Sequence, residues 1–280
     1  MKEINAQEIT KQVKEACIEA CFVLPDDVLD SLKHAWDIEE SPAGKTVIDE
    51  IVENAEIART ERVPICQDTG LTLVFVELGQ DAHIVGGYMY DAINEGVRRG
   101  YEEGYLRKSI VRHPLDRVNT SDNTPAVIHT QIVPGDGLRI IIAPKGGGSE
   151  NMSIARVLKP AEGLNGVRKF VVDTVRSAGS SPCPPIIVGV GLGGTIEKAA
   201  LLSKKAILRK VGEPSQNPID AGIESDLLEA VNRTGVGPSG LGGRVTALAV
   251  HVESYPCHIA SLPVAITIQC HAARHKEIVL

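Results

Sequence analysis

The stretch ICQDTGLTLVFVEL, residues 65–78, decides the fold class of this chain. Six of its last eight residues are apolar, which is typical of a buried strand, and the polar residues before them indicate a loop. Upstream, apolar residues recur with helical period, which predicts helices over about 9–20, 28–36 and 47–58. We therefore expect a helical N-terminal lobe over residues 1–62, followed by a mixed α/β region over residues 63–280.

Downstream of this strand, the apolar patterns alternate between strand and helix. They predict strands at 82–86, 186–190, 245–253 and 264–270, and helices over about 91–106, 164–178, 195–209 and 220–232. Two further β-branched runs, 126–133 and 137–144, flank Pro134, Gly135 and Asp136, which predicts a β-hairpin. Because no linker composition interrupts the chain, we expect one α/β domain over residues 1–280.

Composition narrows the function classes. The chain has 280 residues, 43% of them hydrophobic, and a formal net charge of −7, which is typical of a globular protein with a sizeable core. The acidic balance and the 3% aromatic content disfavour a nucleic-acid partner. No apolar run approaches the ~20 residues that cross a bilayer, and the N-terminus has no signal-peptide pattern. We therefore expect a cytoplasmic protein without a membrane partner, in which the cysteines stay reduced.

Two glycine-rich segments each have a functional and a structural interpretation. GVGLGG, residues 189–194, has the spacing of a dinucleotide-binding turn, but no second strand ending in an acid follows the predicted helix. The alternative is a tight strand-to-helix turn with close packing. KGGGSEN, residues 145–151, follows a predicted strand and is either a structural turn or a set of backbone N–H groups that bind an anionic oxygen.

Three cysteines are expected in loops at the ends of strands. Cys66, Cys183 and Cys270 are flanked by polar, proline or histidine residues, and no Cys-x-x-Cys pair exists. Three such thiolates can converge if their strands share a sheet. Together they suit an iron–sulfur cluster with one open iron. Each cysteine alone can also be a small packing residue. The other three are expected to be packing thiols, namely Cys17, Cys21 and Cys257.

Residues suited to a carboxylate substrate accompany these cysteines. Gln67 and Asp68 follow Cys66 directly, and Arg107 ends a predicted helix. An arginine can bind a carboxylate through two parallel hydrogen bonds. His258 supplies an imidazole. The structural alternatives are a solvated helix end for Arg107 and a turn cap for Asp68.

Taken in order, seven motifs closely resemble the α part of class I fumarases, a family that includes tartrate dehydratases. The motifs are ICQDTG (65–70), NTPAVIHTQIVPGD (123–136), KGGGSEN (145–151), SSPCPP (180–185), GVGLGGT (189–195), GPSGLGG (237–243) and IQCHAARH (268–275). The resemblance covers the chain from about residue 5 to the C-terminus. It implies a hydro-lyase with a four-iron four-sulfur cluster that is held by Cys66, Cys183 and Cys270 and has one iron open to substrate.

The resemblance also implies roles for other residues in the reversible hydration of fumarate to malate, a step of the tricarboxylic acid cycle. Asp68 matches a partner of the catalytic base, and His258 matches a histidine near the substrate. The positions that match substrate-binding or site-lining residues are Gln67, Arg107, Gly146, Gly147 and Gly148.

The catalytic threonine of fused family members lies in a further domain that has no counterpart before Leu280. We therefore expect a separate β subunit that supplies this threonine and more contacts to a small dicarboxylate, in an α2β2 heterotetramer. Two alternatives stay open at this point: a tartrate dehydratase α subunit with the same cluster, and a non-catalytic iron–sulfur scaffold or oxygen sensor. The second needs cysteines but no group that binds a carboxylate.

Overall fold

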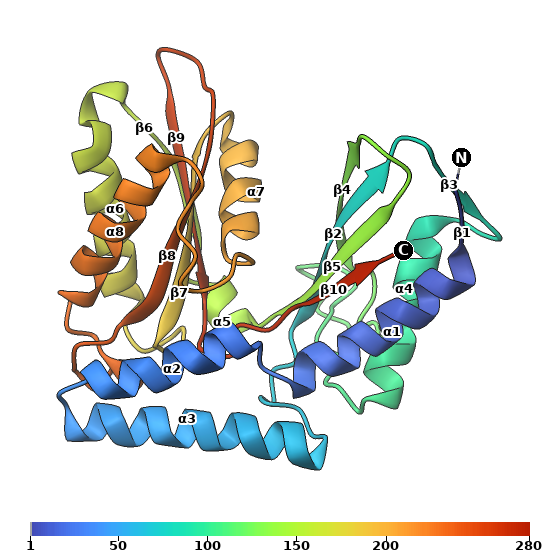
Figure 1. Ribbon diagram of the computed structural model, residues 1–280, viewed down its shortest axis with the longest axis horizontal. Coiled ribbons are helices and arrows are strands. Elements are labelled where there is room, and N and C mark those ends of the chain that lie inside the picture. Colours follow the sequence, from blue (N-terminus) through green and yellow to red (C-terminus); the bar gives the residue numbers. More distant parts are fainter. Residues whose placement is uncertain (1) are drawn as a thin grey trace. The chain divides into compact units, whose positions relative to one another are not determined.

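The computed structural model describes residues 2–280 and divides them into two compact units. The first unit comprises the chain up to Leu24, Ala55–Gly147 and Arg274–Leu280. The second comprises Pro25–Asn54 and Gly148–Ala273. Each unit has its own four-stranded sheet with helices packed on it (Figure 1). The expected mixed α/β class with a helical N-terminal region is therefore confirmed, and both units draw on that helical region.

The first unit is built on a mixed sheet of order β10-β5-β2-β4. Strand β2 pairs in parallel with β4 and antiparallel with β5, while β10 pairs antiparallel with β5. A separate parallel pair joins β1 to β3. The elements are β1 (Lys2–Asn5), α1 (Ala6–Phe22), β2 (Leu71–Gly79), β3 (Ala82–Val85), α4 (Met89–Glu103), β4 (Val127–Val133), β5 (Leu138–Lys145) and β10 (Lys276–Val279).

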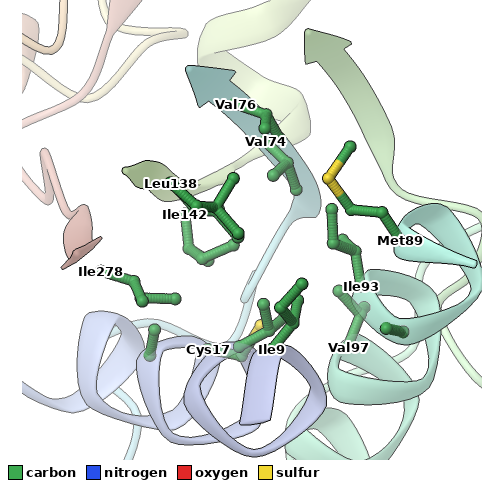
Figure 2. Packing of buried hydrophobic residues seen from close by; sticks show 14 of the residues in the cluster. Ile9, Cys17, Val74, Val76, Met89, Ile93, Val97, Leu138, Ile142 and Ile278 are labelled. Atoms are coloured by element: carbon green, nitrogen blue, oxygen red, sulfur yellow. The ribbon is translucent and has the colours of Figure 1, made fainter. Parts of the chain in front are cut away.

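The core of the first unit lies between this sheet and the helices α1 and α4 (Figure 2). Ile9 and Cys17 point from α1 toward Ile93 of α4, and the spacing of Ile9 and Cys17 is that of one helix face. Val74 and Val76 reach the same core because alternate residues of a strand face one side. The predicted strand at 71–78 is therefore confirmed as the centre of this unit.

The expected β-hairpin of 126–133 with 137–144 is wrong, because β2 lies between β4 and β5. The connection passes over the end of β2, where the N–H of Gly79 donates to the carbonyl of Gly137 at 2.8 Å and the N–H of Asp81 donates to the carbonyl of Gly135 at 2.9 Å. Two strands on either side of a third lie about 10 Å apart, which a short loop can span. The apolar β2 gains a partner on both edges in this way.

The second unit is built on a sheet of order β6-β9-β7-β8. Strand β7 is central, parallel to β8 and antiparallel to β9. Helices α6 and α8 contribute to the apolar core on one face, and α7 packs on the other. The elements are α2 (Asp26–Ile38), α5 (Gly147–Glu150), β6 (Ile154–Leu158), η1 (Pro160–Glu162), α6 (Gly163–Ala178), β7 (Ile186–Gly193), α7 (Ile196–Ala206), α8 (Pro218–Asn232), η2 (Pro238–Gly240), β8 (Ala247–Tyr255) and β9 (Leu262–Gln269). Helix α3 (Pro42–Glu61) begins in the second unit and ends in the first.

The glycines of GVGLGG pack a helix against a strand and form no phosphate-binding turn. Gly189 and Gly191 lie inside β7, where an added Cβ would come within 2.2 Å of the carbonyl oxygen of Ser203 and 1.9 Å of that of Ala199. Helix α7 therefore approaches the backbone of β7 directly. The structural interpretation of this segment is confirmed, and the dinucleotide interpretation is wrong.

Replacing Gly191 by alanine is expected to lower the free energy of unfolding by about 1–3 kcal/mol, because the new methyl group overlaps the backbone of α7. Urea denaturation followed by circular dichroism measures this change. Gly222→Ala is the matched control, since Gly222 lies in α8 with no atom near its absent Cβ. That substitution is expected to be neutral or stabilising by up to about 1 kcal/mol. Equal effects of the two variants would contradict the packing argument.

Candidate functional site

In the first unit, Cys66 lies in the loop that joins α3 to β2. Its side chain is half-buried, and the backbone N–H of Asp68 donates to its Sγ at 3.4 Å. The thiol donates to Oε1 of the exposed Gln67 at 3.3 Å. The Cys66 sulfur is thus accessible and placed where it can act as a ligand.

The Asp68 carboxylate connects this loop to the glycine-rich segment after β5. Oδ1 accepts from the N–H of Gly70 at 3.0 Å, and Oδ2 accepts from the N–H of Gly147 at 2.7 Å. An added Cβ at Gly146 would lie 3.1 Å from Oδ2. One backbone N–H of the predicted anion-binding segment therefore already binds an internal carboxylate. The structure brings Asp68, Gly146 and Gly147 together, as expected of residues in one site.

Buried side chains hold the carbonyl groups of the same loop from behind. The Tyr101 hydroxyl, on α4, donates to the carbonyls of Thr69 at 2.9 Å and Gly70 at 3.0 Å. Asn123 Nδ2 also donates to the carbonyl of Gly70, at 3.2 Å. Burial raises the pKa of the Tyr101 hydroxyl well above its usual value, so it stays a donor. Sequence reasoning missed Tyr101, because a tyrosine in an amphipathic helix carries no separate signal.

The Tyr101 contacts predict a change in stability. Tyr101→Phe is expected to lower the free energy of unfolding by about 1–3 kcal/mol, because the buried carbonyl of Thr69 loses the hydrogen bond that the Tyr101 hydroxyl donates. Tyr105→Phe serves as the control, since Tyr105 is 91% exposed. Urea denaturation of both variants gives the comparison, and a Tyr101→Phe variant as stable as the wild type would show that Tyr101 does not hold the loop.

The backbone of Arg107 is hydrogen-bonded to the loop that contains Cys66. The Thr69 hydroxyl donates to the carbonyl of Arg107 at 3.0 Å, and the Arg107 side chain is exposed. The guanidinium therefore projects into solvent from a residue that is held to the loop. This placement agrees with a side chain that is available to a soluble carboxylate.

Arg274 is a buried cation at the same loop. It is 3% exposed, and Nη2 donates to the carbonyl of Asp68. Within residues 2–280, its Nε and Nη1 have no hydrogen-bond partner. Buried N–H groups without an acceptor are unfavourable, and a buried charge usually has a counter-ion. The guanidinium thus leaves two donors for an anionic group near the Cys66 loop.

In the second unit, the fold brings Cys183 and Cys270 together. Cys183 lies just before β7 and Cys270 just after β9, and these antiparallel strands pair Ile187 with Gln269. The N–H of His271 donates to the carbonyl of Cys183 at 3.4 Å. The backbone of Cys183 is in the left-handed region, with φ +54°. Such a conformation is unfavourable for a residue with a side chain and is common at functional sites.

Gly148 belongs to the second unit and lies beside the Cys183 loop. An added Cβ there would be 3.3 Å from the carbonyl oxygen of Ser181, within the SSPCPP segment. Because they have no Cβ, Gly146 and Gly147 let the Asp68 carboxylate come close to the backbone, and Gly148 does the same for the carbonyl of Ser181.

The remaining cysteines differ in their surroundings. Cys17 and Cys21 are fully buried, and burial raises the pKa of the Cys21 thiol to about 11. Both are packing thiols, as expected. The same expectation is wrong for Cys257, which is exposed in the loop between β8 and β9, where no element covers it. None of the six cysteines forms a disulfide. Across the described residues 2–280, no three His, Cys, Asp or Glu side chains group as metal ligands.

The structure does not bring His258 together with the cysteines of its own unit. His258 precedes β9, whereas Cys270 follows it, so the full length of the strand separates them (Figure 1). Eight residues of strand span about 26 Å. His258 thus lies about a strand length from Cys270, and its expected place near the substrate stays a prediction. Sequence order alone hid this, because only twelve residues separate His258 from Cys270.

In the part of the chain that the structure describes, no helix combines the length and the apolar character that crossing a membrane requires.

Comparison with known proteins assigns the family. The family model for fumarate hydratase (Fumerase) matches residues 10–279. The chain is 43% identical over 275 residues to the putative L(+)-tartrate dehydratase subunit alpha of Methanocaldococcus jannaschii, covering 95% of each chain. It is 35% identical over 290 residues to the L(+)-tartrate dehydratase subunit alpha of Escherichia coli K12, covering 100% of this chain and 94% of that relative. The resemblance inferred from the motifs is confirmed, and the chain belongs to the fumarate hydratase (Fumerase) family.

Proposed function

We propose that this chain is the α subunit of a two-subunit hydro-lyase of class I fumarase type, which interconverts fumarate and malate. Cys66, Cys183 and Cys270 hold a four-iron four-sulfur cluster with one open iron. The observation that carries the proposal is the placement of the cysteines: these three lie in exposed or half-buried loops, and Cys183 and Cys270 lie together. Cys17 and Cys21 are fully buried, and the exposed Cys257 lies at the other end of β9 from Cys270. The N–H of His271, the neighbour of Cys270, donates to the carbonyl of Cys183, so two of the three cysteines lie at the same end of the paired strands β7 and β9.

The donor set fits such a cluster. Thiolates are the usual ligands of iron–sulfur clusters, and a cluster with three thiolate ligands is anionic. Near Cys66, the buried Arg274 has two N–H groups without a partner in the described chain. A buried cation with unused donors is the arrangement that an anionic group stabilises. The backbone N–H directed at the Cys66 sulfur adds to this preference for negative charge.

The bound cluster would supply a Lewis acid that makes hydroxide a better leaving group. The other functions fall to side chains and backbone of the protein. Arg107 and Gln67, both exposed beside the Cys66 loop, bind the substrate carboxylate. Asp68, held by the N–H groups of Gly70 and Gly147, is a rigid partner for the group that removes the C3 proton.

We propose that a separate β subunit completes the site. Both relatives described above are named as alpha subunits. The β subunit carries the catalytic threonine and further groups that bind the dicarboxylate, in an α2β2 complex of the cytoplasm. On this proposal the α chain alone has no hydratase activity, because the β subunit supplies the base.

Tartrate is the second candidate substrate, because the relatives are named L(+)-tartrate dehydratase subunits. Malate and tartrate share the two carboxylates and the leaving hydroxyl, so the same α-subunit groups serve both. The groups that contact the second hydroxyl of tartrate decide whether malate or tartrate is the substrate. A scaffold or sensor role is less well supported, because the loop of Cys66 also carries Gln67, Asp68 and the backbone contact to Arg107.

The first experiment is anaerobic purification of the chain with its β subunit. We expect about four iron and four sulfide ions per α chain. A three-iron electron paramagnetic resonance signal after mild oxidation would show the loss of one open iron. Zinc, or no metal in folded protein kept from air, would refute the cluster.

The rates on fumarate, malate and the tartrate isomers, measured with and without the β subunit, then identify the substrate. A preference for L(+)-tartrate would favour the second candidate. No turnover of any of these substrates by a cluster-loaded complex would favour the scaffold or sensor alternative.

A further inference from the structure

Glu39, at the C-terminal end of α2, is a buried carboxylate held by backbone N–H groups. It is 2% exposed. Oε1 accepts from the N–H groups of Glu40 and Ser41, both at 2.8 Å. Oε2 accepts from the N–H groups of Arg244 at 2.9 Å and Val245 at 2.8 Å, and Oε1 also accepts from Arg244 at 3.0 Å. One side chain thus joins the end of α2 to the segment that leads into β8.

These backbone donors take the place of a cation. Burial alone raises the pKa of the Glu39 carboxyl, but the N–H groups outweigh it and hold the pKa below its usual value. The surroundings leave no space for other side chains: an added Cβ at Gly243 would lie 2.7 Å from Oε1, and one at Gly44 would lie 3.0 Å from Cγ of Glu39. Gly243 of GPSGLGG therefore lets the backbone approach this carboxylate.

The segment that Glu39 holds is packed directly against the Cys183 loop. The N–H of Ser239 donates to the carbonyl of Pro184 at 2.9 Å. Gly240 has φ +75°, and an added Cβ there would lie 2.5 Å from Cβ of Ser180. Cys183 lies between Ser180 and Pro184 and has the unfavourable φ of +54°. Surrounding contacts must maintain that conformation, and the segment 237–245 supplies contacts on both sides of Cys183.

We propose that Glu39 is a positioning residue for Cys183, acting through the segment 237–245. Its carboxylate fixes the N–H groups of Arg244 and Val245. The fixed segment then holds the backbone of the Cys183 loop in the conformation that presents the sulfur. Glu39 does not touch the substrate or the cluster. The inference rests on the proposed function in one respect, namely that Cys183 is a cluster ligand.

The test is amide hydrogen exchange of the full chain, read by mass spectrometry on peptides that cover 180–186 and 237–246. Glu39→Gln removes the charge and keeps one acceptor oxygen. We expect exchange about tenfold faster in both peptides, with exchange in α6 unchanged. A general loss of stability would instead accelerate exchange in α6 as well. Glu39→Asp keeps the charge on a shorter side chain and, if Glu39→Gln does not fold, carries the same test with a smaller expected increase.

The matched control is Glu40→Gln. Glu40 is the neighbouring residue, and its exposed side chain pairs with the Arg244 guanidinium at 2.8 Å without binding the backbone of the segment. We expect exchange in both peptides to match the wild type. The second readout is the half-time of iron release to a chelator, expected to be at least about threefold shorter in Glu39→Gln than in Glu40→Gln.

Unchanged hydrogen exchange of residues 180–186 in Glu39→Gln would overturn the positioning role. Faster exchange in that variant without faster iron release, in a chain that holds the cluster, would overturn it as well. If the wild-type chain holds no iron, the proposed function fails, while the exchange data still decide whether Glu39 holds the Cys183 loop.

Discussion

Replacing Cys66, Cys183 or Cys270 by serine, one at a time, is expected to abolish cluster binding and to lower hydratase activity of the complex by more than about 100-fold. A serine hydroxyl is not a thiolate and is a poor ligand for iron in a cluster. Loss of residues that only support metal ligands typically costs about 10- to 100-fold, so loss of a ligand should exceed that range. Iron and sulfide analysis, together with fumarate hydration rates, measures the effect.

Cys257→Ser is the matched control for these variants. Cys257 is an exposed thiol of the second unit, in the loop between β8 and β9, and its Sγ donates to the carbonyl of Ser261 at 3.3 Å. Iron content and activity should equal those of the wild type. If one of the three serine variants kept a full cluster, that cysteine would not be a ligand, and the assignment of the set would fail.

Asp68→Asn is expected to lower kcat of the complex by about 100- to 10,000-fold, the range typical of general acid–base groups. The amide keeps one acceptor oxygen for the N–H of Gly70 or Gly147 but loses the negative charge beside the proposed base. Steady-state rates over a range of pH give kcat and KM separately. On the proposal that Arg107 and Gln67 bind the carboxylate, KM should change much less than kcat.

A purely structural Asp68 would give a different pattern. The variant would then lose stability and cluster content, with kcat per bound cluster close to the wild type. Asp91→Asn is the control, because Asp91 is an exposed carboxylate in the first turn of α4. It is expected to leave kcat and iron content unchanged. Equal kcat values in Asp68→Asn and Asp91→Asn, per cluster, would contradict a catalytic role for Asp68.

Local periodicity predicted most of the helices and strands, because the spacing of apolar residues in an amphipathic segment indicates which side is buried. The central strand of the first unit and the helix near 164–178 both follow this rule. Periodicity did not predict the short strands β1, β6 and β10. Four or five residues with mostly exposed side chains carry no clear period, and their strand conformation comes from pairing with a distant partner.

The supporting residues of the candidate site also lie beyond the reach of sequence patterns. Tyr101 and Glu39 look like ordinary members of helical segments, and Arg274 like part of a basic tail. Each acts on a loop that is tens to hundreds of residues away: Tyr101 binds the carbonyl of Thr69, and Glu39 binds the N–H of Arg244. A polar side chain shows such a role only when its burial and its partners are known together.

The sequence by itself determined the family, the mixed α/β class and the cysteines worth testing, because ordered motifs and local apolar periods are properties of the chain alone. Only the tertiary structure decided that β2 separates β4 from β5, that His258 lies a strand length from Cys270, and that Cys257 is exposed. These features depend on which distant segments pair and which surfaces they cover. Pairing and burial are set by the free energy of the whole packed unit rather than by any one segment.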